Sequence, residues 1–221
     1  MANASFTRDE VILALDVFYS FEKDTGYIGP DKMQELSLLL RRLPIHSIQD
    51  DDLSFRSASG IRGQLHLMKK SLESGIKSKD VGQLFIDIAE EFRDRYDNLH
   101  VIAEAIRRNE ATFVSLFGAP LEDIGFSEGI LLGHLHRLIE QRDGTKSDMK
   151  NRCEVCNIQP GLYYCNSGQL LQNHLVVAPT LMDYSKKYRA DSFLTVCPTC
   201  HAALHRFRPW LTKENCQDVL R

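Results

Sequence analysis

The sequence lacks long apolar runs, a strong excess of one charge and any internal repeat. No run approaches the roughly 20 apolar residues that a membrane-spanning helix needs, and the first ten residues have no apolar core of the kind that a signal peptide has. We therefore expect a cytoplasmic protein without a membrane segment, in a compartment where thiols stay reduced. Six cysteines in such a compartment favour metal binding over disulfides.

The net charge of −3 combines two parts of opposite sign. Residues 151–221 contain eight Lys+Arg and five Asp+Glu, whereas the rest of the chain contains 19 and 25. The basic part also contains the residues that could bind metals. This asymmetry is compatible with a nucleic-acid partner, although the overall charge gives no support for one.

Residues 1–143 follow helical spacing and predict a mainly helical domain. Thr7 and Glu10 have the spacing of a capping box, and Pro44 must end a helix that starts near Pro30. Further helices are expected at about 62–73, 80–96, 100–108 and 127–141.

The sequence changes character after residues 143–151, a polar stretch that we interpret as a linker. Short runs with strand character follow at 162–165, 175–178 and 193–196, and a short helix is expected after Pro198. The predicted fold class is therefore α+β, with a helical domain at 1–143 and a small domain at 144–221. Since so few strands bury little apolar surface, we expect a metal to stabilise the small domain.

Two CxxC pairs, Cys153 with Cys156 and Cys197 with Cys200, are separated by 40 residues. Two CxxC turns can direct four thiolates at one tetrahedral ion, and this ligand set favours structural zinc. The alternative is redox chemistry, but a thioredoxin-like site needs one CxxC in a βαβ setting, which is missing here. Cys165 and Cys216 lie outside the pairs, and we expect ordinary half-buried cysteines there.

Three histidines accompany these cysteines. His174 lies between the two pairs, and His201 and His205 follow the second pair at spacing i, i+4, which places both imidazoles on one side of a helix. Phosphodiester hydrolysis needs an activated water and a cation at the phosphate, and these three residues can supply a base and two metal ligands. His134 and His136, only two residues apart, should face different ways and lie at a surface or a domain contact.

The order of these motifs resembles the HNH (ββα-metal) nucleases with four zinc-binding cysteines. The resemblance implies that His174 is the general base, that Asn173 occupies a neighbouring ligand position, and that His201 and His205 bind a catalytic Mg²⁺, Mn²⁺, Ni²⁺ or Zn²⁺. The family usually has His or Asp at position 173, and Asn or an acid at the position of Ser192, which orients the base. These departures imply a weakened nuclease or an altered metal preference, with Asp191 as a substitute for the bracing role.

Further stretches, at 128–136, 140–143 and 152–156, and at 8–16, 43–46 and 55–61, resemble McrA-like restriction endonucleases, which cut DNA carrying modified cytosine. The resemblance implies double-stranded, methylated DNA as the partner and residues 1–143 as the reading domain. Because one HNH module cuts one strand, a homodimer is expected, with the apolar helical surface from Leu131 to Ile139 as its contact.

Cations that could contact DNA phosphates occur in both predicted domains. The segment from Phe55 to Arg62 is the best candidate for a DNA-reading loop, because it combines an aromatic ring, cations and small residues. An ordinary solvated surface is the alternative for each cation. The candidates are Arg41, Arg42, Arg56, Arg62, Lys69, Lys70, Lys186, Lys187 and Arg189.

Four functions remain open at this point. The first is a modification-dependent restriction endonuclease, and the second is a reader of modified DNA with a silent HNH module. The third is a zinc-stapled interaction module without a DNA role, and the fourth is an HNH enzyme that ignores modification. Cleavage of matched methylated and unmethylated plasmids distinguishes them.

Overall fold

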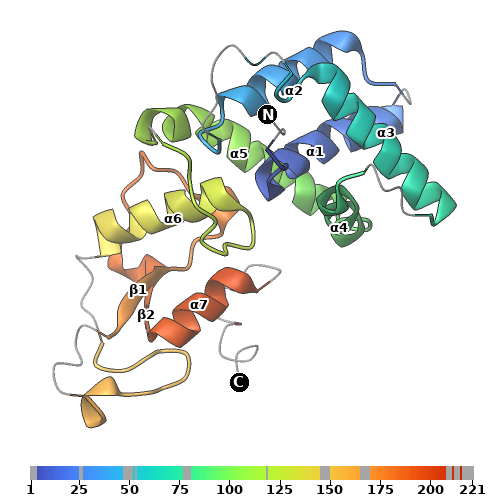
Figure 1. The fold of residues 1–221 in the computed structure, drawn as a ribbon. Helices are drawn as coiled ribbons and strands as arrows, with labels where there is room; N and C mark the ends of the chain where they lie inside the picture. The colour runs from blue at the N-terminus through green and yellow to red at the C-terminus, as the bar shows by residue number, and fades with distance from the viewer. Residues whose placement is uncertain are drawn as a thin grey trace. The chain divides into compact units, whose positions relative to one another are not determined.

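The computed structural model describes residues 4–24, 27–46, 52, 54–76, 81–117, 119–144, 150–164, 170–207, 211 and 215. The chain divides into two compact units, Met1–Glu122 and Asp123–Arg221 (Figure 1). The described residues are mainly helical with one small two-stranded antiparallel sheet, which is consistent with the predicted α+β class. Of the helices described, none is both long and apolar enough to cross a membrane.

The first unit, here the helical unit, is built around a central helix. Its described helices are α1 (Arg8–Asp24), α2 (Pro30–Arg42), α3 (Ala58–Ser74), α4 (Gln83–Glu91) and α5 (Tyr96–Leu116). Figure 1 shows α1 lying among the others, and it packs against all four. Every residue from Val11 to Leu15 is fully buried, so this part of α1 is covered on all sides.

Local capping explains where two of these helices begin. The carboxylate of Glu10 accepts hydrogen bonds from the backbone N–H and the hydroxyl of Thr7, as the predicted capping box requires for its acidic partner. Ser57 caps α3 by accepting a hydrogen bond from the Gly60 N–H. Because α3 starts directly after this cap, residues 58–62 are helical. The prediction of a loop conformation there was wrong, whereas the DNA-reading role of the segment stays a prediction.

A break that the sequence pattern did not reveal separates α4 from α5. The predicted helix at 80–96 ends as α4 at Glu91, and Arg95 donates its N–H to the Phe92 carbonyl in the turn that follows. α5 then begins at Tyr96 and runs to Leu116, well beyond the predicted 100–108. Apolar residues on both sides of the turn keep helical spacing, so periodicity alone could not locate it.

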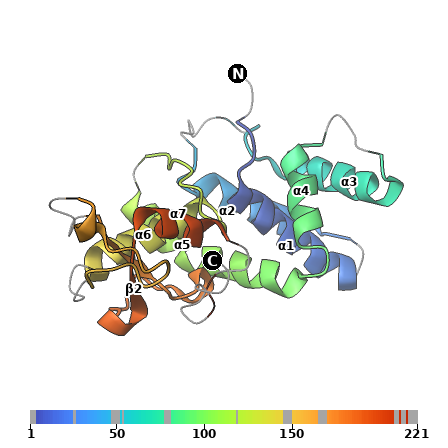
Figure 2. The ribbon, with the colours of Figure 1, turned by 90° about the horizontal axis from the view of Figure 1, so that it is seen from below.

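The second unit, here the ligand unit, places a β-hairpin against two helices. Its helices and strands are α6 (Ile130–Asp143), β1 (Gln172–Leu175), β2 (Phe193–Val196) and α7 (Pro198–Arg206), with short 3₁₀ turns η2 (Pro160–Leu162), η4 (Pro179–Leu181) and η5 (Ala190–Ser192). β1 pairs antiparallel with β2, and both α6 and α7 pack against β1 (Figures 1 and 2). α6 thus belongs to the ligand unit, whereas the predicted boundary after residue 143 assigned it to the first domain.

Only one of the three predicted strands has the expected position. The strand at 193–196 is confirmed, and the helix after Pro198 is α7. β1 lies three residues upstream of the predicted 175–178. The described part of 162–165 is the end of η2 and a turn, because Pro160 starts a 3₁₀ turn there; Cys165, like Cys216 and most of the predicted linker, lies outside the described residues.

α6 is buried within the ligand unit. A Cβ on Gly133 would lie 2.5 Å from the Cβ of Phe126, so only glycine permits this close approach. Leu131, Leu135 and Ile139 are fully buried. The apolar surface from Leu131 to Ile139 that was expected to mediate a dimer contact is therefore interior, and that assignment was wrong; the dimer itself stays a prediction.

Candidate metal centres

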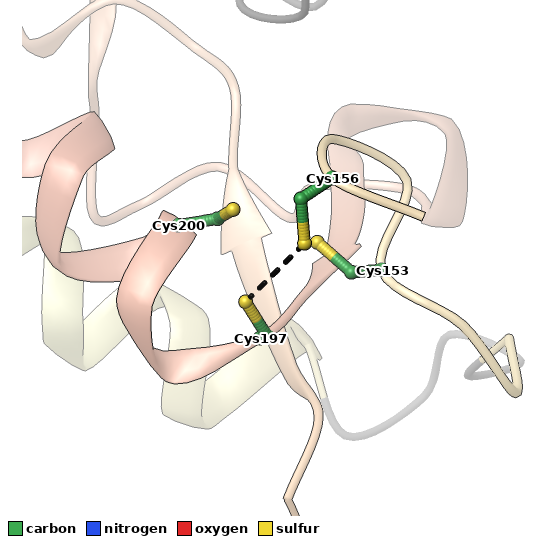
Figure 3. Close-up of side chains that lie close together, drawn as sticks. All are labelled: Cys153, Cys156, Cys197 and Cys200. Atoms are coloured by element: carbon green, nitrogen blue, oxygen red, sulfur yellow. Dashed lines mark hydrogen bonds between the residues drawn. The ribbon is translucent and has the colours of Figure 1, made fainter. Parts of the chain in front are cut away.

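The four cysteines of the two CxxC pairs converge at one point (Figure 3). Their sulfur atoms all lie within 4.8 Å of one another, and those of Cys156 and Cys197 are 3.8 Å apart. A tetrahedral zinc site with Zn–S bonds of about 2.3 Å has sulfur–sulfur separations of about 3.8 Å. All four are free thiols, so the cluster can hold a metal ion such as zinc.

Backbone geometry shapes the first CxxC turn. The N–H of Cys153 donates to the Ile158 carbonyl, and the N–H of Asn157 donates back to the Cys153 carbonyl, both at 2.9 Å. Asn157 has a φ of 62°, a left-handed conformation that asparagine tolerates better than most residues. This reversal turns Cys153 and Cys156 towards the same point.

The second CxxC turn is the start of α7. Cys197 is the N-cap residue, and Pro198 follows at a position where its missing N–H costs no helical hydrogen bond. The two turns are joined through β2, since the N–H of Glu154 donates to the Thr195 carbonyl and the N–H of Thr195 donates to the Glu154 carboxylate.

The cysteines also form part of a small apolar core. Cys153, Cys197 and Cys200 are buried in it, together with Val155, Leu171, Leu194, Val196, Leu204 and Leu211. Burial raises the pKa of the Cys200 thiol. Burial also raises that of Cys153, but backbone hydrogen bonds at Cys156 and Cys197 outweigh it and leave the Cys153 pKa lowered. A bound cation would displace the remaining protons, so metal affinity should fall in acid.

A second cluster brings together five side chains from three elements: His136 and Glu140 of α6, His174 of β1, and His201 and His205 of α7. We call it the histidine–glutamate cluster. The potential ligand atoms of His136, Glu140, His174 and His205 all lie within 4.8 Å of one another. His201 joins them through its Nε2, which is 3.0 Å from Nε2 of His205.

Glu140 stands at the centre of this cluster. Its Oε1 lies 3.3 Å from a ring nitrogen of each of His136, His174 and His201, and it accepts the N–H of Leu175 at 2.9 Å. Burial raises the pKa of Glu140, but the charge and hydrogen bond of His136, with hydrogen bonds from His174 and His201, outweigh it and hold the pKa well below its usual range. The carboxylate is therefore ionised at neutral pH.

Two histidines of the cluster are held neutral. Burial lowers the pKa of His174 to about 4, against the opposing effect of Glu140 as a hydrogen-bond acceptor for the ring. Burial, reinforced by the charge of His136, holds the pKa of His205 far below its usual value. A neutral imidazole is the form that accepts a proton or binds a metal ion.

Sequence reasoning missed His136 and Glu140. His136 was expected at a surface or domain contact, but it is fully buried, so the surface assignment was wrong. The available signal was their spacing of i, i+4 on one helix, the same spacing that singled out His201 and His205.

The two neighbouring positions implied by the family resemblance lie differently. The side-chain amide of Asn173 donates to the Gly144 carbonyl at 2.6 Å, and its oxygen is 3.4 Å from the hydroxyl of Thr195. Ser192 accepts the Val176 N–H with its backbone carbonyl, and its hydroxyl is 3.5 Å from the Asp191 carboxylate. Both residues thus contact the hairpin and its surroundings, and their catalytic roles stay predictions.

The cations of the helical unit that were predicted to contact DNA differ in their solvent exposure. The side chain of Arg56 is 2% exposed, and its guanidinium donates to Glu10 and to the carbonyls of Ala4 and Ser5. Arg56 therefore stabilises the fold, and its buried guanidinium is not available for a DNA phosphate.

The other cations of the helical unit lie on α2 and α3. On α2, Arg41 donates to the backbone carbonyls of residues 52 and 55, and Arg42 forms an ion pair with Glu110 at 2.8 Å. On α3, Lys69 lies 3.9 Å from Glu73, and the guanidinium of Arg62 lies over the ring of Tyr27. Lys70 is exposed. Their contacts with DNA stay predictions.

Three exposed cations of the ligand unit lie on a segment that α6 anchors. Lys186, Lys187 and Arg189 are exposed. The guanidinium of Arg142 donates to the carbonyls of Tyr184 and Lys186 and to its neighbour Asp143, and Asp143 also accepts the N–H of Tyr188. These bonds fix the backbone of the segment while its basic side chains project outward.

Comparison of the chain with protein-family models, with curated proteins and with solved structures finds no match in any of the three. The resemblance to HNH nucleases therefore depends on the motif residues and on the geometry of the ligand unit alone.

Proposed function

We propose that this chain is a metal-dependent DNA endonuclease of the zinc-stapled HNH kind. The observation that carries the proposal is the convergence of His174, from β1, with His201 and His205, from α7, directly beside a four-cysteine cluster. A hairpin followed by a helix, with a histidine on the first strand and two on the helix, is the arrangement that the sequence motif implied.

The residues suit phosphodiester hydrolysis. His174 is neutral at pH 7, so it can take a proton from the attacking water. His201 and His205 would hold a divalent ion, which supplies positive charge for the phosphate and the leaving oxygen. Lys186, Lys187 and Arg189 would contact the phosphates beside the scissile bond.

The proposed substrate is duplex DNA containing methylated cytosine, with the helical unit as the reader. The test is incubation of matched methylated and unmethylated plasmids with the full chain and, in turn, Mg²⁺, Mn²⁺, Ni²⁺ or Zn²⁺. We expect nicking or cleavage of the methylated plasmid with at least one ion. Equal cleavage of both plasmids would leave the nuclease but remove the modification dependence.

The second candidate is a reader of modified DNA whose HNH module is silent. The observation that favours it is the side chain of Asn173, which is occupied by the Gly144 carbonyl, since the family places a metal ligand at this position. Retarded migration of methylated duplex without cleavage in any of the four ions would support this candidate over the nuclease.

A further inference from the structure

Three of the carboxylates with little solvent exposure, Glu10, Asp16 and Glu140, differ in the cations beside them. Glu10 pairs with Arg56 at 2.5 Å, and Asp16 pairs with Arg107 at 2.6 Å. Glu140 is 9% exposed, and its ion-pair partners in the described chain are imidazoles alone. Since a buried carboxylate is costly unless a cation neutralises it, the cation for Glu140 has to come from these rings or from an ion that they help to bind.

The tautomer of His136 is determined by its outer contact. Its Nε2 lies 2.8 Å from the Leu175 carbonyl oxygen, which can only accept, so Nε2 carries a hydrogen. In the neutral ring Nδ1 is then an acceptor, and it faces Glu140 Oε1 at 3.3 Å. A carboxylate oxygen and a bare ring nitrogen at this distance repel each other unless a proton or a metal ion lies between them.

His201 repeats this arrangement from α7. Its Nδ1 lies 2.5 Å from Oε1 of Gln172, which accepts, so the bare nitrogen of the neutral ring is Nε2. That nitrogen faces Glu140 Oε1 at 3.3 Å and His205 Nε2 at 3.0 Å. Metal-binding histidines almost always donate their outer N–H to a protein oxygen in this manner, because the bond fixes the ring and its tautomer.

Three of the distances between the inward atoms match those around one ion. Four ligand atoms at about 2.0–2.1 Å from a tetrahedral ion are separated from one another by about 3.3–3.4 Å. Glu140 Oε1 lies 3.3 Å from Nδ1 of His136 and from Nε2 of His201, and the two α7 histidines are 3.0 Å apart.

We propose that His136 and Glu140 of α6, together with His201 and His205 of α7, bind one divalent transition-metal ion that is separate from the ion of the four cysteines. Three imidazoles with one carboxylate favour ions of the zinc, nickel and cobalt type over Mg²⁺, which prefers oxygen ligands and water. α6 thereby contributes two of the four ligands, and the ion would contact a phosphate by expanding to five-coordination. His174, also 3.3 Å from Glu140, remains beside it as the proton acceptor.

This inference adds two ligands to the proposed nuclease centre, and the chemical role of the ion rests on that proposed function. The binding of the ion itself can be measured without DNA. The experiment uses the full chain with the cysteine site loaded with zinc, titrated with Co²⁺. We expect one further equivalent to bind, with visible d–d absorption and no sulfur-to-cobalt charge-transfer band. Millimolar Mg²⁺ should leave this absorption unchanged.

Two variants and a control test the ligand assignment. Glu140→Gln retains an oxygen for the Leu175 N–H, and His136→Gln removes one imidazole from the same helix. Each should weaken binding of the second Co²⁺ by at least about 100-fold, more than the roughly 10–100-fold that loss of an outer-sphere partner costs. His134→Gln, two residues away on α6, should bind Co²⁺ as the unmutated chain does.

The outcomes separate this inference from the proposed function. If the unmutated chain binds no second ion, the cluster is an imidazolium–carboxylate network and the inference is overturned. This result does not depend on whether the variants fold. Unchanged Co²⁺ affinity in Glu140→Gln and His136→Gln, or displacement of Co²⁺ by Mg²⁺, would overturn it as well. A second ion that binds as expected, in a chain that cleaves no DNA, would support the inference and refute the nuclease.

Discussion

The two units of this chain both bury polar side chains, but they surround them with different partners. In the helical unit the carboxylates of Glu10 and Asp16 are neutralised by arginines that the same unit supplies. In the ligand unit four thiols form one cluster, and four imidazoles surround the carboxylate of Glu140 in a second cluster. The helical unit thus supplies guanidinium groups to these two carboxylates, whereas the two clusters of the ligand unit contain side chains that could hold metal ions.

Removal of zinc should produce the largest difference between the units. In zinc-stabilised peptides the metal contributes roughly 10–16 kcal/mol, and the core around Cys153 and Cys200 is small. We expect a chelator, or Cys153→Ser, to abolish protection of backbone amides at 150–164 and 170–207 against hydrogen exchange, while α1 and α5 stay protected. Equal loss of protection in both units, or no loss in either, would contradict this division.

The next largest effect concerns catalysis in the ligand unit. His174→Ala should lower the rate of plasmid cleavage by about 10²–10⁴-fold, the usual contribution of a general base, without loss of the cysteine-bound zinc. His134→Ala is the matched control and should cleave at about the rate of the unmutated chain. Comparable rates in the two variants would remove His174 from the mechanism.

In the helical unit the buried ion pair should matter more than any exposed one. Arg56→Met leaves Glu10 buried without its guanidinium, and breaking a pair in this manner costs about 3–5 kcal/mol. Arg42→Met breaks the pair with Glu110, in which Arg42 is 61% exposed, and should cost about 0–1 kcal/mol. Urea unfolding followed by circular dichroism measures both; similar midpoints would show that burial does not distinguish these pairs.

A smaller effect should appear in acid. Burial raises the pKa of Glu10, but hydrogen bonds from His46 and Arg56 outweigh it and hold the pKa below the ordinary value of 4.5. The stability that this ionised carboxylate contributes is therefore fully present above about pH 4.5 and is lost as the pH falls through its folded-state pKa. Glu10→Gln should lower stability at neutral pH and flatten the profile of urea midpoint below pH 4.5; a profile as steep as that of the unmutated chain would assign the acid sensitivity elsewhere.

The smallest expected effect is at the exposed cations. Lys187→Gln should weaken binding to every duplex alike and reduce the slope of log K against log salt by about 1, as loss of one phosphate contact does. Lys32→Gln, in an exposed pair on α2, is the control and should leave the slope unchanged. The same slope in both variants would place the DNA contact away from the 183–189 segment.

Much of the ligand unit could be read from local sequence because its chemistry is local. A CxxC turn directs two thiolates at one point whatever surrounds it, and spacing of i, i+4 places His201 and His205 on the same side of any helix. The hydrogen bond from the Thr7 N–H to Glu10, which is the acidic half of the predicted capping box, depends in the same way on a separation of three residues. The strand at 193–196 and the helix after Pro198 likewise followed from short patterns.

What the sequence determined by itself was thus the α+β class, the two ligand-rich motifs and the residues that can form a four-cysteine site. Tertiary structure decided which other side chains join them. Arg56 became an internal cation because α1 brought Glu10 to it from 46 residues away, and His136 became part of the histidine–glutamate cluster because α6 packs against β1. Contacts between distant segments depend on how whole helices pack, and the spacing of residues within one segment contains no record of that packing.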